Sequence, residues 1–127
     1  RVRSVVVGAS GVPLGMVEGC DRHGRTIVQA WGMTEMSPLG TTCRLPRELE
    51  QWPQSARTRY RARQGVPVPF VDIRVRDEQG NPVTFDDTAM GELEVRGPWV
   101  ASAYYGREGD AEFTDDGWFR TGDVVQM

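Results

Sequence analysis

The sequence predicts an α/β segment built on a parallel sheet, followed by a smaller segment made of β-strands. Residues 2–29 read as strand, loop, helix and strand, which is the repeating unit of a parallel sheet. From Gly65 onward, short stretches alternate apolar and polar residues with the period of two that is typical of half-buried strands. The 15 glycines and 8 prolines among 127 residues indicate many turns and short elements rather than a helical bundle.

Local patterns predict the elements of the first segment. Valines at four of the six positions of Val2–Val7 predict a buried strand. The small residues of Gly8–Pro13 form a loop, and its final proline suits the first turn of a helix. We expect this helix to start at Leu14 and to stop at Gly24, and Thr26–Gln29 predicts the second strand.

Residues 46–64 are expected to form a helical connector, either one helix interrupted at Pro53 or two shorter helices. Its second half carries arginines at every other position, which a helix would spread around its surface: Arg57, Arg59, Arg61 and Arg63. We interpret this segment as a solvated connector. RNA binding by these arginines is the alternative, but the net charge of −3 disfavours a dedicated nucleic-acid binder.

The second segment is expected to form a small sheet or an open, distorted β-barrel. Val71–Arg76 and Glu92–Arg96 alternate as strands do, and Gln79–Pro82 predicts a turn between them. Residues 113–125 indicate further short strands around a turn at Gly117. We therefore divide the chain into the end of an α/β subdomain (1–45), the helical connector (46–64) and a β subdomain (65–127).

Composition excludes several kinds of chemistry. All 15 basic residues are arginines, so no lysine of this chain can serve as a nucleophile or grip a phosphate. His23 is the only histidine, which argues against a histidine metal cluster or a Ser–His–Asp triad. Cys20 and Cys43 lack a CxxC spacing and indicate reduced thiols of a cytoplasmic protein. No apolar run approaches the roughly 18–20 residues of a membrane span.

Three stretches carry residues suited to nucleotide chemistry. Gly8–Pro13 lets backbone approach a ligand, and Trp31–Glu35 offers an aromatic ring, a hydroxyl and a carboxylate for purine, phosphate and Mg²⁺. Arg120–Asp123 places a carboxylate at the end of a predicted strand, where acidic residues bind ribose hydroxyls in other folds. Taken singly, each stretch is better explained by an ordinary turn or a buried tryptophan.

Taken together and in this order, the stretches resemble the adenylate-forming superfamily of acyl-CoA synthetases, luciferases and peptide-synthetase adenylation domains. Residues 29–38 (QAWGMTEMSP) are similar to its aromatic-Gly-x-Thr-Glu motif, and residues 116–123 (DGWFRTGD) to its Thr-Gly-Asp motif. Residues 91–98 (GELEVRGP), 8–13 (GASGVP) and 65–69 (GVPVP) resemble its Gly-Glu-Leu motif, its adenine loop and the entry to its β subdomain. The tryptophan at position 31 and the run 36–41 look most like medium- and long-chain fatty acyl-CoA synthetases.

The resemblance implies that ATP activates a carboxylic acid as an acyl-adenylate, which coenzyme A then captures as a thioester. Ser10, Gly11 and Val12 would lie along the adenine, with Trp31 against its face. Thr34 would contact phosphate, and Glu35 would help to hold Mg²⁺; both are the implied catalytic residues. Asp123 would bind the ribose, and Gly32 and Met33, which complete the nucleotide site, would border the acyl group.

The same resemblance implies that parts are missing. The phosphate loop with its lysine, the hinge and the C-terminal domain with the catalytic lysine are not in this sequence. We therefore expect a fragment of a large N-terminal domain, inactive alone and prone to self-association through unpaired strand edges. An aryl- or amino-acid adenylating ligase and a non-catalytic nucleotide-binding module are the alternatives.

Overall fold

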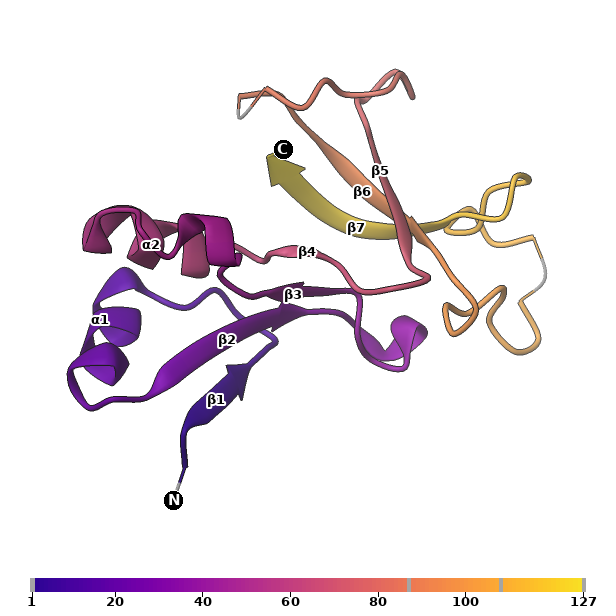
Figure 1. The fold of residues 1–127 in the computed structure, drawn as a ribbon. Helices are drawn as coiled ribbons and strands as arrows, with labels where there is room; N and C mark the ends of the chain where they lie inside the picture. Colours follow the sequence, from indigo (N-terminus) through magenta and orange to yellow (C-terminus); the bar gives the residue numbers. More distant parts are fainter. Residues whose placement is uncertain (1, 87, 108, 127) are drawn as a thin grey trace. The chain divides into compact units, whose positions relative to one another are not determined.

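The computed structural model describes all residues except 1, 87, 108 and 127, and it divides into two compact units, residues 1–68 and 69–127 (Figure 1). Among the described residues, the first unit contains a four-stranded mixed sheet with helices, and the second a three-stranded antiparallel sheet. The predicted order of an α/β part followed by a β part is therefore confirmed. The boundary between the two units lies after residue 68, shortly beyond the helical connector. The connector itself belongs to the first unit.

The first sheet changes from parallel to antiparallel pairing at its second strand. β1 (Ser4–Val7) runs parallel to β2 (Thr26–Trp31), with Val7 opposite Gln29. β2 pairs antiparallel with β3 (Thr41–Cys43), which pairs in turn with β4 (Val66–Pro67). The predicted parallel unit is confirmed, although β1 starts two residues later and β2 ends two residues later than the patterns indicated. The prediction that the first strand is buried is wrong, because β1 lies at the edge of the sheet with Val5 and Val6 41% and 70% exposed.

Helix α1 (Leu14–Arg22) connects the two parallel strands. It follows Pro13, and its last turn closes where the Gly24 N–H donates to the Asp21 carbonyl at 2.9 Å. Gly24 has φ +62°, a conformation that favours glycine, so the predicted stop is confirmed. Val17 is fully buried against Ile27 of β2, and burying such a side chain contributes about 1.5–3 kcal/mol.

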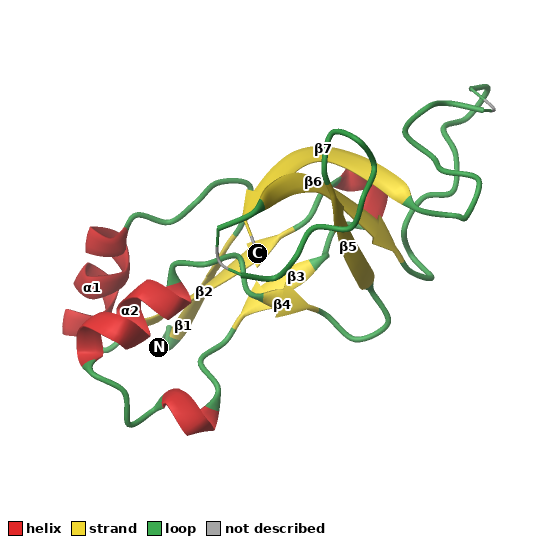
Figure 2. Cartoon of the chain, turned by 90° about the horizontal axis from the view of Figure 1, so that it is seen from above, coloured by secondary structure: helices red, strands yellow, loops and turns green. Residues whose placement is uncertain are grey.

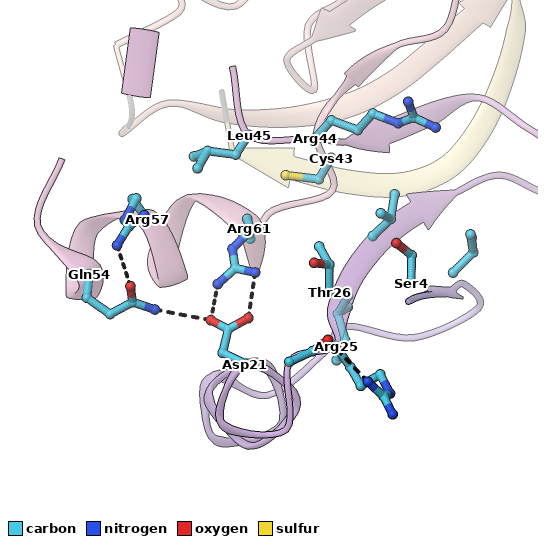
Figure 3. A pocket seen from close by; sticks show the side chains of 14 residues that line it. Ser4, Asp21, Arg25, Thr26, Cys43, Arg44, Leu45, Gln54, Arg57 and Arg61 are labelled. Atoms are coloured by element: carbon cyan, nitrogen blue, oxygen red, sulfur yellow. Dashed lines mark hydrogen bonds and ion pairs between the residues drawn. The ribbon is translucent and has the colours of Figure 1, made fainter. Parts of the chain in front are cut away.

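The connector forms two short helices, a 3₁₀ helix at Arg47–Leu49 and helix α2 (Gln54–Arg61), with Pro53 at the start of the second. Helix α2 packs beside α1, as Figure 2 shows. The prediction of a solvated connector is wrong at Arg61, which is only 9% exposed. Its guanidinium forms a bidentate ion pair with Asp21 of α1, with Nη1 and Oδ1 2.8 Å apart, and this partner satisfies the charge that the helix contact buries (Figure 3).

The second sheet contains β5 (Asp72–Arg76), β6 (Met90–Arg96) and β7 (Phe119–Gln126), with β6 at its centre. Its two faces differ because side chains alternate along each strand. One face carries the buried core of the unit: Val75, Leu93, Val95 and Phe119. The turn predicted at residues 79–82 forms as Asp77 accepts hydrogen bonds from the Gln79 and Asn81 N–H groups at 2.9 and 2.7 Å.

The described residues include no helix with the length and apolar composition of a membrane-spanning segment.

The Asp21–Arg61 pair predicts how the stability of the chain depends on pH. The hydrogen bonds from Arg61 hold the pKa of Asp21 below the ordinary value of 3.8, so the stabilisation is present above that pH. It is lost as the pH falls through the lowered pKa of the folded state. We expect Asp21→Asn to lower the free energy of unfolding at pH 7, and the difference from the unmodified chain to shrink below about pH 4.

Chemical denaturation of both chains between pH 2 and pH 7 measures this difference. Asp115→Asn, on an exposed turn, is the control and should follow the unmodified chain throughout. A difference that stays constant across this range would contradict the role of the ion pair.

Candidate functional site

The parallel pairing of β1 and β2 places two of the predicted stretches at the same end of the first sheet, where both strands have their carboxyl ends. Gly8–Pro13 leaves the carboxyl end of β1, and Trp31–Glu35 leaves the carboxyl end of β2. The first residue of the loop after β1 still lies beside β2, because a Cβ at Gly8 would lie 3.4 Å from the carbonyl oxygen of Ala30, the residue before Trp31. The sheet also changes from parallel to antiparallel pairing here, and ligands of open α/β sheets bind outside such carboxyl ends.

In the loop after β1, the small residues Ser10 and Gly11 are exposed, whereas Val12 is buried. Ala9 has φ +68°, a conformation that is costly for a residue with a Cβ, and strain of this kind is concentrated at binding sites. Ser10 and Gly11 are exposed, and no other group lies within 4 Å of a Cβ at Gly11. Val12 is buried with Val17 and Ile27 and anchors the loop to the core of the first unit.

Gln29 fixes this loop, a role that the sequence analysis missed. Its side chain is fully buried in β2, and its Oε1 accepts a hydrogen bond from the Val12 N–H at 3.2 Å. Its Nε2 has no hydrogen-bond partner among the described residues. A glutamine in the middle of an otherwise apolar strand was the signal in the sequence, because a buried amide needs partners.

The stretch after β2 folds back tightly on itself. A Cβ at Gly32 would lie 1.8 Å from the Pro38 carbonyl oxygen, and one at Gly40 would lie 2.6 Å from the Trp31 ring. The Gly40 N–H also donates to the Trp31 carbonyl at 2.9 Å. Glycine is therefore required at both positions, and these contacts leave Trp31 half-buried at the rim of the loop.

Thr34 and Glu35 belong to a single 3₁₀ turn, Thr34–Met36. Met36 is fully buried and anchors this turn. Thr34 is exposed, whereas Met33 and Glu35 are half-buried. The first unit thus presents a hydroxyl and a carboxylate on a turn that the buried Met36 anchors, in the segment that follows β2.

Asp123 belongs to the second unit and lies within β7, not at a strand end as predicted. The register explains the difference. Glu94 lies opposite Arg120 and Glu92 opposite Val124, so three residues of β7 bulge opposite one residue of β6. Gly122 has φ +73°, and the Thr121 hydroxyl donates to the Leu93 carbonyl at 2.7 Å. The bulge leaves Asp123 exposed, with its N–H donating to Thr121 Oγ1 at 3.1 Å.

A pocket of about 820 Å³ lies away from these residues, at the amino ends of β1 and β2 (Figure 3). Ser4 and Thr26 line it together with the Asp21–Arg61 pair. It contains none of the residues that the motifs identified, and three of its polar side chains, Asp21, Gln54 and Arg61, are engaged in holding α1 against α2.

The motif residues of the first unit fit a magnesium ion that is held mainly through a nucleotide. Mg²⁺ usually takes one or two protein carboxylates and completes its shell with water and substrate phosphates. Among the described residues, no three His, Cys, Asp or Glu side chains gather as a metal-ligand group. The half-buried Glu35, next in sequence to Thr34, would supply the single carboxylate that such a phosphate-bound ion requires.

The fold and the motif loops define the class of AMP-binding, adenylate-forming proteins, and comparison with known sequences agrees. A profile of the AMP-binding enzyme family matches residues 1–105, and the chain belongs to this family. The resemblance drawn from the sequence is thereby confirmed.

Individual relatives are acid–CoA ligases. The chain is 38% identical, over 126 residues, to the long-chain-fatty-acid–CoA ligase of Thermus thermophilus, covering 98% of this chain and 23% of that one. It is 36% identical, over 125 residues, to the medium-chain-fatty-acid–CoA ligase of Ectopseudomonas oleovorans, covering 97% of this chain and 22% of that one. The chain therefore spans about a quarter of the length of these relatives.

Solved structures give the same fold. A long-chain-fatty-acid-CoA ligase from Archaeoglobus fulgidus superposes with a TM-score of 0.75 at 28% identity, over 98% of this chain and 26% of that one. The o-succinylbenzoate CoA synthetase of Bacillus subtilis, in complex with its acyl-adenylate intermediate, gives 0.76 at 28% identity, over 98% and 30%. The predicted fold, part of the N-terminal domain of these enzymes, is confirmed.

The hydrogen bond from Val12 to Gln29 predicts a local effect of mutation. We expect Gln29→Leu to speed hydrogen exchange at the Val12 amide by about fivefold or more, because a typical hydrogen bond contributes about 1 kcal/mol. Exchange followed by NMR measures this rate. Gln51→Leu, on the exposed surface, is the control and should leave the Val12 rate unchanged. An equal rate in both variants would show that Gln29 does not fix the loop.

Proposed function

We propose that this chain is a segment of a longer AMP-forming acyl-CoA synthetase and supplies much of its nucleotide site. The carboxylate oxygen of the acid attacks the α-phosphorus of ATP, the bond to the β-phosphate oxygen breaks, and pyrophosphate leaves. The thiol sulfur of coenzyme A then attacks the acyl carbonyl and displaces AMP, while the thiol proton passes to solvent. The observation that carries this proposal is that both motif segments leave the carboxyl ends of the paired parallel strands β1 and β2.

The proposed roles follow the exposure of each residue. The backbone of Ser10, Gly11 and Val12 lines the adenine, because small or inward-turned side chains leave room for a flat base. The half-buried Trp31 ring packs against that base. Asp123 accepts hydrogen bonds from the ribose hydroxyls, which suits an exposed carboxylate on a fixed bulge.

The residues around the phosphates act by charge and by position. Thr34 donates a hydrogen bond to a phosphate oxygen, and Glu35 holds Mg²⁺, which neutralises charge on the phosphates when it is bound. Gly32 and Met33 border the acyl group at the reacting carboxylate. Phosphoryl transfer requires alignment and charge stabilisation more than a protein nucleophile.

We propose a fatty acid as the substrate, since two of the relatives carry fatty-acid–CoA ligase names at 36–38% identity. An aryl acid is the second candidate, because the o-succinylbenzoate enzyme shares the fold. A panel of fatty, aryl and amino acids distinguishes the two. The free thiols of Cys20 and Cys43 support action in the cytoplasm, where thiols stay reduced.

The test of the proposed activity is ATP–pyrophosphate exchange by the longer protein, measured with each acid of the panel. We expect exchange that depends on the acid, and a loss of about 100-fold for Glu35→Gln, the usual effect of removing one electrostatic stabiliser. Glu18→Gln, on the exposed side of α1, is the control and should keep full exchange. The absence of exchange with every acid, or equal exchange in the two variants, would refute the proposal.

The 127-residue chain alone should be inactive and should self-associate. It has no lysine, and β1 forms an edge of the first sheet with Val5 and Val6 41% and 70% exposed. Unpaired backbone beside exposed apolar side chains favours pairing with a second copy. We expect light scattering to report a dimer or a larger species, whereas a single monomeric species at all concentrations would contradict the self-association.

A further inference from the structure

A buried carboxylate stands at the centre of the charged face of the second sheet. Glu94, on the middle strand β6, is 3% exposed. Its Oε2 accepts a hydrogen bond from Arg74 Nε of β5, and its Oε1 lies 3.3 Å from Arg120 Nε of β7. One carboxylate therefore bridges all three strands of the sheet among the described residues.

The Arg74 partner is itself held from several sides. Its Nη1 and Nη2 lie 2.6 and 3.2 Å from the two carboxylate oxygens of Asp116. Hydrogen bonds from Arg74 and then from the Thr114 hydroxyl hold the pKa of Asp116 far below its usual range, so this partner stays charged. The Arg74 guanidinium also lies 4.4 Å from the Trp118 ring centre, which limits where it can move.

The bridge stands at the start of the bulge that displays Asp123. Glu94 lies opposite Arg120, the last paired residue of β7 before the bulge, and the next pair is Glu92 with Val124. On β6, Leu93 lies between Glu92 and Glu94, and its carbonyl accepts a hydrogen bond from the Thr121 hydroxyl. The Glu94–Arg120 contact thus fixes the place on β6 from which the three bulged residues begin.

We propose that Glu94 is a positioning residue for Asp123, setting the register of the Thr121–Asp123 bulge through its ion pairs with Arg120 and Arg74. A slip of β7 would take Arg120 away from the buried Glu94 carboxylate and leave Arg74 of β5 as its remaining ion-pair partner among the described residues, which is unfavourable for a buried charge. The ion pairs of Glu94 therefore hold β7 in its register. Glu94 itself acts on the nucleotide only through the position of Asp123. This inference rests on the proposed role of Asp123 at the ribose.

Ribose discrimination in the longer ligase tests this inference. The measured quantity is the kcat/KM for ATP divided by that for 2′,3′-dideoxy-ATP, which lacks both hydroxyls. We expect Glu94→Gln to lower this ratio at least fivefold through KM for ATP, with kcat and the constants for the dideoxy nucleotide nearly unchanged. Asp72→Asn removes the exposed ion pair with Arg96 on the same face and should leave the ratio unchanged.

Asp123→Asn separates the failure of this inference from the failure of the proposed function. If Asp123→Asn leaves the ratio intact, Asp123 does not bind the ribose and the proposed role is refuted. If Asp123→Asn lowers the ratio but Glu94→Gln does not, Glu94 is not a positioning residue. An equal loss with both nucleotides in Glu94→Gln would indicate a general structural defect and would also overturn the inference.

A second variant keeps the test valid if Glu94→Gln fails to fold. Arg120→Gln removes the other half of the contact from a side chain that is 46% exposed, and it should lower the ratio in the same way. Arg120→Lys, which keeps the charge, should retain at least part of the discrimination. Discrimination that is unchanged in Arg120→Gln would overturn the inference independently.

Discussion

The parallel pairing of β1 with β2 is the constraint on which the first unit depends. Parallel neighbours need a crossover, and here the crossover is helix α1, which buries Val17 against Ile27. The same pairing places the loops that follow both strands at one edge of the sheet. Gln29 of β2, opposite Val7, holds the loop after β1 against β2 by accepting a hydrogen bond from the Val12 N–H. The candidate site is therefore a consequence of how the sheet is paired, and it does not depend on loop residues alone.

In the second unit, ion pairs help to fix the register of β7 against β6. A bulge interrupts β7, and an interrupted ladder can slip. The buried Glu94 carboxylate, shared by Arg74 and Arg120, disfavours any register that separates it from these partners. Both units thus display their exposed motif residues from anchors that are buried: Gln29 and Met36 in the first, Glu94 and Leu93 in the second.

The sequence predicted those features that depend on neighbouring residues. The start of α1 after Pro13 and its end at Gly24 follow from local backbone preferences, and the motif order indicated the family. The burial of Arg61 was not predictable, because its partner Asp21 lies 40 residues away. The position of Asp123 within β7 was missed for the same reason, since the bulge is defined by the pairing with β6.

We propose that the exposed motif residues of this chain bind the adenosine part of ATP in a longer ligase. The most direct measurement is a crystal structure of that ligase with AMP bound. In that structure we expect the Asp123 carboxylate to lie within hydrogen-bond distance of both ribose hydroxyls and the adenine to pack against Trp31. We also expect the hydrogen bond between Gln29 and Val12 to be retained. A nucleotide bound elsewhere, or a ribose that is held by other residues while Asp123 faces solvent, would contradict it.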